Sequence, residues 1–290
     1  MNLDPRSLKI DPYKLVDDAP NVPSLPLVYE ELNQAINDPS SSSTTIGDVI
    51  GKDAGLAARL LRIANSALYS FPSRIDTISQ AIIVIGIQQL RDLTLGTSVI
   101  ELFEGISIEL VNMDSFWRHS IACGICARVL ATYRREANVE RYFVAGLLHD
   151  IGRLIMYLKL PDHASESLIR CKTSGELMYK VEREFMECDH CDIGSALLQH
   201  WKLPTNLVEG VMHHHYPLRA TRYPIEASLV HIADIIANAM QIGTSGEHFV
   251  PPLVPETWER SGLSPSILAP TLAEVDRQMA DMIEMLLKGS

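Results

Sequence analysis

An adjacent histidine and aspartate, His149 and Asp150, lie within the apolar run "VAGLLHDIGRL" of residues 144–154. A buried imidazole next to a buried carboxylate is costly unless both polar groups find partners. A metal ion ligated by both groups would satisfy them, and so would an ordinary hydrogen bond or ion pair at a helix end. The pair therefore gives two hypotheses, a metal site and a structural contact, which imply different kinds of protein.

Two other polar residues share the apolar stripe of a predicted helix. His119 follows Phe116 by three residues, and Asp234 follows Val230 by four. Residues at these spacings lie on one face of an α-helix, so both side chains are expected to face inward. Inward-facing histidine and aspartate on separate helices are what a metal site in the core of a helical bundle requires.

Each of these residues also has a structural explanation. A single inward histidine such as His119 is more often hydrogen-bonded within a core than bound to a metal. The run of residues 213–215, "HHH", fits a solvated helix end, where cationic imidazoles interact favourably with the helix dipole. Asp234 has an alternative partner in Arg62 or another basic residue. For single residues both explanations stay open.

The composition limits the classes of partner. Hydrophobic residues make up 47% of the 290 residues and charged residues 21%, which is typical of a globular protein in water. The 25 basic and 36 acidic residues give a net charge of -11, which opposes a nucleic-acid groove or an anionic membrane surface. The start "MNLDPRSLKIDP" does not resemble a signal peptide, and apolar runs are too short to span a bilayer. We expect a cytoplasmic protein with no nucleic-acid or membrane partner.

The five cysteines, an odd number, favour reduced thiols over a disulfide framework. Four of them form two C-x-x-C pairs, Cys123/Cys126 and Cys188/Cys191, a spacing that also occurs in zinc sites. The first pair lies in a helical run without the glycine-rich turn of a zinc knuckle. We therefore favour buried thiols over a four-cysteine zinc site.

The elements that must position these residues are helices. Apolar residues recur at helical spacing along nearly the whole chain, and strand-like alternation is scarce, so the sequence predicts an all-α protein. The expected helices cover residues 25–38, 46–69, 77–103, 114–136, 139–150, 162–172, 174–187, 192–201, 206–215, 225–243 and 267–288. In the last of them, five apolar residues near helical spacing indicate packing on its own chain, namely Leu272, Val275, Met279, Met282 and Ile283.

Several segments together resemble an HDOD domain. The segments are "LPLVYEELNQAINDP", "IGKDAGLAARLLRIANSALYS", "IDTISQAIIVIGIQQLRDLTLG", "LLHDIGRLIM" and "DIGSALLQHWKLPTNLVEGVMHHH". The pattern D-x-x-L-x-x-x-L-L-R-x-A-N-S-x-x-Y over 53–69 is the most specific of them. The resemblance implies a multi-helix bundle of the HD-domain type with an N-terminal helical lobe. The expected organisation is an extension (1–21), an HDOD domain (22–245) made of the helical lobe (22–108) and an HD-like metal-binding lobe (109–245), and a loop with a C-terminal helix (246–290).

HDOD domains are bacterial signalling modules derived from the HD superfamily of metal-dependent phosphohydrolases, and many members have lost the metal ligands. In the related HD-GYP proteins, which hydrolyse cyclic dinucleotides, a pair of metals is held by a lone His, a His-Asp pair, a lone His, a His-His pair and a late Asp. On this sequence that pattern selects His119, His149, Asp150, His190, His213, His214 and Asp234. The resemblance implies that the first metal is held by His119, His149, Asp150 and Asp234. It also implies that Asp150 bridges to a second metal held by His190, His213 and His214.

The sequence departs from these relatives at two places. Arg153 stands where they carry lysine, and the "GYP" segment is missing from "HHHYPLRATRYP". A glutamate that adds a third metal in some relatives would fall near Ser115, so we expect no third ion. The remaining histidines, His163, His200, His215, His231 and His248, are interpreted as structural or surface residues. Among them His231, one turn before Asp234, is the best candidate for a group behind the ligands.

The donor set of imidazoles and carboxylates suits divalent metal ions of a particular class. Iron or manganese is favoured, with zinc or nickel also suited, over magnesium or calcium. Two hypotheses about function follow. One is a phosphohydrolase acting on a nucleotide or other phosphoester, with Asp150 as metal bridge and Arg153 as a clamp on phosphate oxygens. The other is a non-catalytic module that recruits unidentified signalling proteins, with a structural or vestigial metal. The sequence leaves enzymatic activity open.

Overall fold

The computed structural model describes residues 9–17, 23–104, 106 and 108–288. Within these ranges every regular element is a helix, so the all-α prediction is confirmed. None of these helices combines the length and apolar character that crossing a bilayer requires. The predicted N-terminal extension contributes the short helix α1 (Pro12–Asp17), and residues 1–8 and 18–21 of it lie outside the described ranges.

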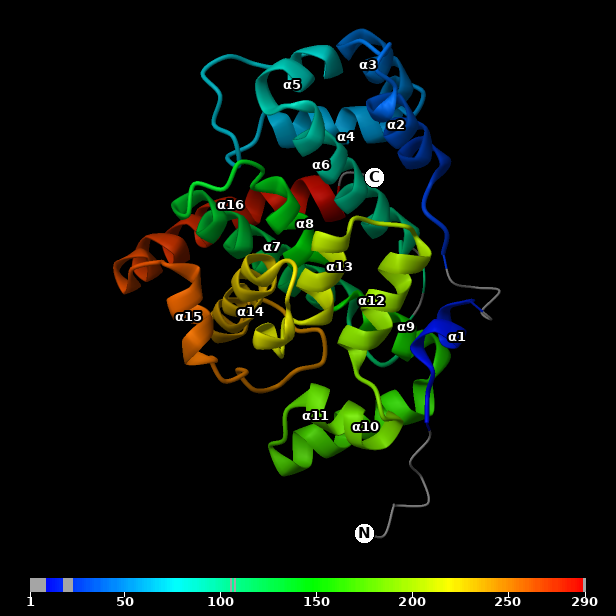
Figure 1. Cartoon of the computed structure of the whole chain (residues 1–290), viewed down its shortest axis with the longest axis vertical. Coiled ribbons are helices and arrows are strands. Elements are labelled where there is room, and N and C mark those ends of the chain that lie inside the picture. The colour runs from blue at the N-terminus through cyan, green and yellow to red at the C-terminus, as the bar shows by residue number, and fades with distance from the viewer. Residues whose placement is uncertain (1–8, 18–22, 105, 107, 289–290) are drawn as a thin grey trace.

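Five helices form the N-terminal part, at the top of Figure 1. They are α2 (Leu27–Asn37), α3 (Ser43–Gly51), α4 (Ala54–Ala64), α5 (Ile78–Ile85) and α6 (Ile87–Leu102). Two long predicted helices are each divided in the structure. The first is divided at Asp53, whose carboxylate accepts the backbone N–H of Leu56 and caps α4. The second is divided at Gly86, whose φ of +102° turns the chain between α5 and α6.

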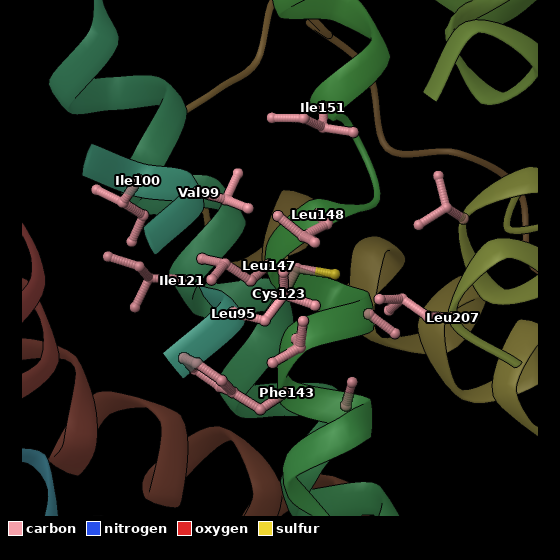
Figure 2. Packing of buried hydrophobic residues seen from close by; sticks show 14 of the residues in the cluster. Leu95, Val99, Ile100, Ile121, Cys123, Phe143, Leu147, Leu148, Ile151 and Leu207 are labelled. Atoms are coloured by element: carbon pink, nitrogen blue, oxygen red, sulfur yellow. The ribbon is translucent and has the colours of Figure 1, made fainter. Parts of the chain in front are cut away.

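The larger part of the chain packs around α7 (Met113–Tyr133), which contacts α8 (Glu140–Leu148) and α14 (Pro224–Ala239). The other helices of this part are α9 (Ile151–Lys159), α10 (Pro161–Ser174), α11 (Met178–Met186), α12 (His190–His200), α13 (Thr205–Met212) and α15 (Pro255–Ser261). Both α9 and α15 are additional to the helices expected from the sequence. Figure 2 shows the buried core, in which Leu95 of α6, Ile121 of α7 and Phe143 of α8 lie together.

The C-terminal helix α16 (Leu268–Leu287) packs on its own chain, as predicted. It contacts α7, α4 and α6, and so lies between the N-terminal helices and the rest of the protein (Figure 1). Val275, Met279, Met282 and Ile283 are buried there, whereas Leu272 remains 38% exposed. The helix therefore fastens the two parts of the fold to each other.

Candidate metal centre

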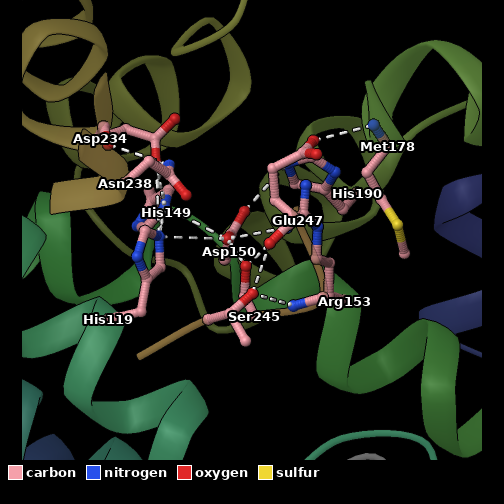
Figure 3. A network of polar contacts seen from close by, with 12 residues as sticks. His119, His149, Asp150, Arg153, Met178, His190, Asp234, Asn238, Ser245 and Glu247 are labelled. Carbon is pink, nitrogen blue, oxygen red and sulfur yellow. Dashed lines mark hydrogen bonds and ion pairs between the residues drawn. The ribbon is translucent and has the colours of Figure 1, made fainter. Parts of the chain in front are cut away.

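Six of the residues selected by the sequence pattern converge within the larger part, and Figure 3 labels His119, His149, Asp150, His190 and Asp234 among them, with His214 beside His190. They come from separate elements: His119 from α7, His149 and Asp150 from the junction of α8 and α9, His190 from the start of α12, His214 from the segment after α13, and Asp234 from α14. All six side chains are buried, with at most 3% of each residue exposed. The site is thus enclosed within the core.

Two glycines allow these elements to approach closely. A Cβ atom on Gly146 of α8 would overlap the backbone of Cys123 in α7, one turn from His119. A Cβ atom on Gly152 of α9 would overlap the carbonyl oxygen of His190 in α12. These two close backbone contacts bring residues 149–150, between α8 and α9, next to His119 and His190.

We expect Gly152→Ala to separate α9 from α12 and to weaken metal binding. Overpacking of this kind costs about 1–3 kcal/mol, which lowers the melting temperature of a chain of this size by several degrees. Gly51→Ala is the matched control, because an added methyl group there meets nothing within 4 Å. Thermal melts and metal content of the two variants check this. Equal melting temperatures and metal contents would contradict the close packing of α9 on α12.

The first group of donor atoms surrounds the Nε2 atoms of His119 and His149, which lie 3.3 Å apart. The Oδ1 atom of Asp234 lies 3.3 Å and 3.4 Å from these two nitrogens. The Oδ2 atom of Asp150 lies 3.3 Å from Nε2 of His149 and 3.8 Å from Nε2 of His119. Two imidazoles and two carboxylates therefore face one another.

The second group uses the other oxygen of the same aspartate. The Oδ1 atom of Asp150 lies 3.0 Å from Nε2 of His190 and 3.8 Å from Nε2 of His214. These two nitrogens lie 3.3 Å apart. The carboxylate of Asp150 thus stands between the two groups, with one oxygen toward each.

Hydrogen bonds made by the Nδ1 atoms fix the ring orientation of three of the histidines. The Nδ1–H of His149 donates to the carbonyl oxygen of Gly146, and that of His214 donates to Val211, both at 2.7 Å. The Nδ1–H of His190 donates to the Glu182 carboxylate at 2.5 Å. These bonds leave the Nε2 lone pairs directed into the site, which is how metal-binding histidines are oriented in proteins.

The observed donors fit divalent cations. In a tetrahedral site with metal–nitrogen distances of about 2.0–2.1 Å, neighbouring nitrogens lie about 3.3–3.4 Å apart, close to both Nε2 pairs here. Lone pairs that face each other at this distance repel unless a cation or a proton lies between them. In addition, Oδ1 of Asp150 is buried without a hydrogen bond among the described residues. The geometry therefore suits one cation on each side of Asp150.

The ionisation states of the buried groups also suit metal binding. Burial disfavours the ionised form of both aspartates and so raises their pKa. Arg153 and the imidazoles outweigh burial and hold the pKa of Asp150 well below its usual range. His119 and His149 do the same for the pKa of Asp234. Burial lowers the pKa of His214, which keeps that ring neutral. Ionised carboxylates and a neutral imidazole are the forms that ligate metals.

Unlike His214, His149 is expected to be protonated when no cation is present. Burial opposes its protonation, but the Asp150 carboxylate outweighs burial and raises the pKa of His149 well above its usual value. A proton on this ring then supplies positive charge between the carboxylates, a place that a bound cation would take over.

The run of three histidines differs from the pattern implied by the resemblance. His213 is partly exposed at the C-terminal end of α13, and the donor groups do not include it. His215, interpreted from the sequence as structural or surface, is buried. Its donor atom lies within 4.8 Å of those of His190, Cys191 and His214. The inward pair is therefore His214 and His215.

His231 supports the segment that carries His214. Its Nδ1–H donates to the carbonyl oxygen of His214 at 2.7 Å, and its Nε2 accepts the N–H of Val254 at 3.1 Å. Burial lowers the pKa of His231, consistent with a neutral ring that donates on one side and accepts on the other. This contact places His231 directly behind a donor residue, as expected from the sequence.

Removal of this support is expected to weaken metal binding. We expect His231→Ala to reduce affinity about 10–100-fold, the usual effect of losing a group that orients a ligand. His200→Ala is the control, since His200 is an α12 histidine paired with Asp17 at 2.9 Å, outside the donor groups. Competition titrations with a chromophoric chelator measure the affinities. Equal affinities in two folded variants would show that His231 does not position His214.

Arg153 and the loop that follows α14 cover the Asp150 side of the site. The Arg153 guanidinium is buried and donates to Oδ2 of Asp150 at 3.2 Å and to Oγ of Ser245 at 2.5 Å, while Ser245 also bonds Asp150 (Figure 3). The Tyr157 hydroxyl donates to the carbonyl oxygen of Ser245 at 2.6 Å. Glu247, two residues further along the loop, accepts the N–H of Met178 at 2.8 Å. The loop after α14 therefore covers the charged groups.

Sequence reasoning missed Ser245, Glu247 and Glu182. Ser245 and Glu247 act through contacts with residues far away in the chain, whereas Glu182 contacts His190 eight residues further along. Neither periodicity nor the family pattern marks Ser245 or Glu247. A weak signal for Glu182 is its place on the apolar stripe of α11, between buried Met178 and Met186.

The fold and the site define the class of protein, an all-helical domain with histidines and aspartates clustered in its core. The chain belongs to the HDOD family, whose domain model matches residues 22–217. A similar solved structure is an HDOD domain protein of unknown function from Geobacter sulfurreducens. It is 23% identical with a TM-score of 0.78, and the match covers 95% of this chain and 98% of that one.

Two structures from Shewanella amazonensis are also similar. One, provisionally named a phosphohydrolase, is 26% identical with a TM-score of 0.74, over 95% of this chain and 97% of that one. The other, provisionally named a metal-dependent phosphohydrolase, is 25% identical with a TM-score of 0.67, over 92% and 95%. An uncharacterised Treponema pallidum protein is 26% identical over a 209-residue alignment, and the match covers 69% of this chain. The match spans only 39% of that protein.

Proposed function

We propose that this chain is a bacterial, cytoplasmic signal-transduction protein of the HDOD family that binds two divalent metal ions. The observation that supports the proposal is that the two carboxylate oxygens of Asp150 face different pairs of histidines. Oδ2 faces His119 and His149. Oδ1 faces His190 and His214. Asp234 adds a second carboxylate on the first side. The imidazole-rich donor set favours iron or manganese, with zinc or nickel also suited.

The signalling role rests on the closed state of the centre. The donor residues are at most 3% exposed, and the Arg153 guanidinium already bonds Asp150 and Ser245. A phosphoester cannot reach Arg153 unless the loop around Ser245 moves. A metal centre enclosed in this way ties together α7, α9, α12 and α14 and so stabilises one arrangement of the surface that recruits signalling partners.

Phosphoester hydrolysis is the second candidate. It is favoured by the position of the Asp150 carboxylate between the two groups of histidines and by the provisional names of the two Shewanella proteins. A pair of bound cations supplies an activated water and neutralises phosphate oxygens. In this chain Asp150 would bridge, and Arg153 would orient the phosphate. Arginine does not donate a proton to a leaving group at neutral pH, so Arg153 fits a clamp better than a general acid.

The experiment that separates the candidates combines elemental analysis with turnover of a generic phosphodiester such as bis(p-nitrophenyl) phosphate. Bound metal without turnover in the presence of several divalent ions supports the signalling module. Turnover that disappears in Asp234→Ala supports the hydrolase. Purified, folded protein that binds no divalent metal overturns both.

A further inference from the structure

A crevice of about 290 Å³ lies between the N-terminal helices and the larger part of the fold. Its walls come from α2 and α6 on one side and from α8 and α13 on the other. Leu95 of α6, Val144 of α8 and Leu207 of α13 give it an aliphatic lining, and all three are buried. Binding sites for small molecules often lie between domains and combine an apolar lining with a few polar groups, which is the composition found here.

Three side-chain amides line the same crevice without a partner in the protein. They belong to Gln88 and Gln89 of α6 and to Asn206 of α13. No hydrogen bond within the described part of the chain uses these amides, and none of their atoms is buried without a partner, so solvent reaches them. Each amide therefore offers a ligand a hydrogen-bond donor and an acceptor side by side.

The two arginines of the crevice are already paired with carboxylates. Arg91 donates to Oδ1 of Asp92 at 2.8 Å and 3.1 Å. Arg141 lies 3.3 Å from Glu136 and 3.2 Å from Glu226. These carboxylates balance the positive charges, which favours an uncharged ligand over an anion. The two arginine side chains remain 21% and 32% exposed, which leaves their planar guanidinium groups accessible to a flat ring.

We propose that this crevice binds the base of a purine nucleoside. A purine carries donors and acceptors next to each other on its edge, and asparagine and glutamine pair with such an edge through both atoms of the amide. Its flat faces suit the aliphatic lining and stacking on guanidinium groups.

A ligand in the crevice touches both parts of the fold. It contacts α6 of the N-terminal part and α8, the helix that ends next to His149. The site lies outside the donor groups of the metal centre, so the proposal goes beyond the function proposed above and does not depend on bound metal.

The test is isothermal titration calorimetry of the full chain with adenosine and with guanosine. We expect saturable binding at one site for at least one of the two nucleosides, and no binding of D-ribose. Metal-free protein should give the same result, so failure of this proposal is distinguishable from failure of metal binding.

Three variants locate the bound nucleoside. Gln89→Leu combined with Asn206→Leu removes two amides at little change in side-chain size, and the affinity should fall at least about tenfold. Ala137→Trp, at an exposed residue of the rim, fills the crevice and should abolish binding. Gln34→Leu is the control, because Gln34 is an exposed glutamine of α2 outside the crevice. Circular dichroism confirms that each variant is folded.

Absence of binding by both nucleosides would overturn the proposal. Binding of D-ribose as tight as that of the nucleosides would overturn recognition of the base. Equal affinities in folded Ala137→Trp and in the original protein would overturn the assignment to this crevice.

Discussion

Asp150→Ala is expected to remove both metal ions, reducing bound metal from about two equivalents per chain to about none. The reason is the position of this carboxylate, whose two oxygens lie 3.0 Å from Nε2 of His190 and 3.3 Å from Nε2 of His149. Removal of any other donor residue leaves one group complete, whereas removal of Asp150 takes an oxygen from both. Elemental analysis of the purified variant after dialysis gives the number.

The control for this prediction must lose a buried carboxylate elsewhere. Asp92 of α6 is 7% exposed, pairs with Arg91 at 2.8 Å and accepts Asn138 at 2.7 Å. Asp92→Ala therefore also removes a buried carboxylate and leaves an arginine unpaired, although Arg91 is more exposed than Arg153, and the variant should keep its metal. Asp150→Asn, which preserves the side-chain shape, guards against misfolding. Metal content equal to that of the original protein in a folded Asp150 variant would remove Asp150 from the centre.

Removal of metal by chelation is expected to lower the melting temperature by roughly 5–10 °C. A ligand present at 100 times its dissociation constant stabilises the folded state by about 2.7 kcal/mol, and each kcal/mol shifts the melting temperature of a chain of this size by about 2–4 °C. The physical cause is that the donors come from separate helices, which the cations hold together. Buried carboxylates left without cations add to the loss.

Differential scanning calorimetry before and after chelation measures this shift, and elemental analysis verifies that the metal has gone. Restoring the metal should restore the melting temperature. The Asp150→Ala variant should melt at the same temperature with and without chelator, because it has no metal to lose. An unchanged melting curve in metal-depleted original protein would contradict a centre that stabilises the fold.

Helical spacing predicted the parts of the site that lie inside long helices. Each of His119 and Asp234 shares a stripe with apolar neighbours, which predicts an inward side chain, and both are buried in α7 and α14. The prediction was less secure where helices end. Residues 213–215 follow α13, and His213 has non-helical backbone angles, so helical periodicity does not decide which imidazoles turn inward.

Contacts between distant segments could not be predicted from the sequence. Ser245 lies 95 residues from Asp150, in a loop that Tyr157 and Glu247 tie to distant parts of the chain. The sequence favours a buried thiol at Cys191, which the structure confirms. Its approach to two histidines depends on how α12 meets the segment after α13, which only the packed fold defines.

The central claim is that two cations flank Asp150, and anomalous diffraction from crystals of the protein tests it most directly. Data collected above and below the absorption edges of iron, manganese and zinc should give two peaks about 3.5–4 Å apart. One should lie between His119, His149 and Asp234, and the other beside His190 and His214. A map of metal-supplemented crystals without a peak in contact with Asp150 would contradict the account.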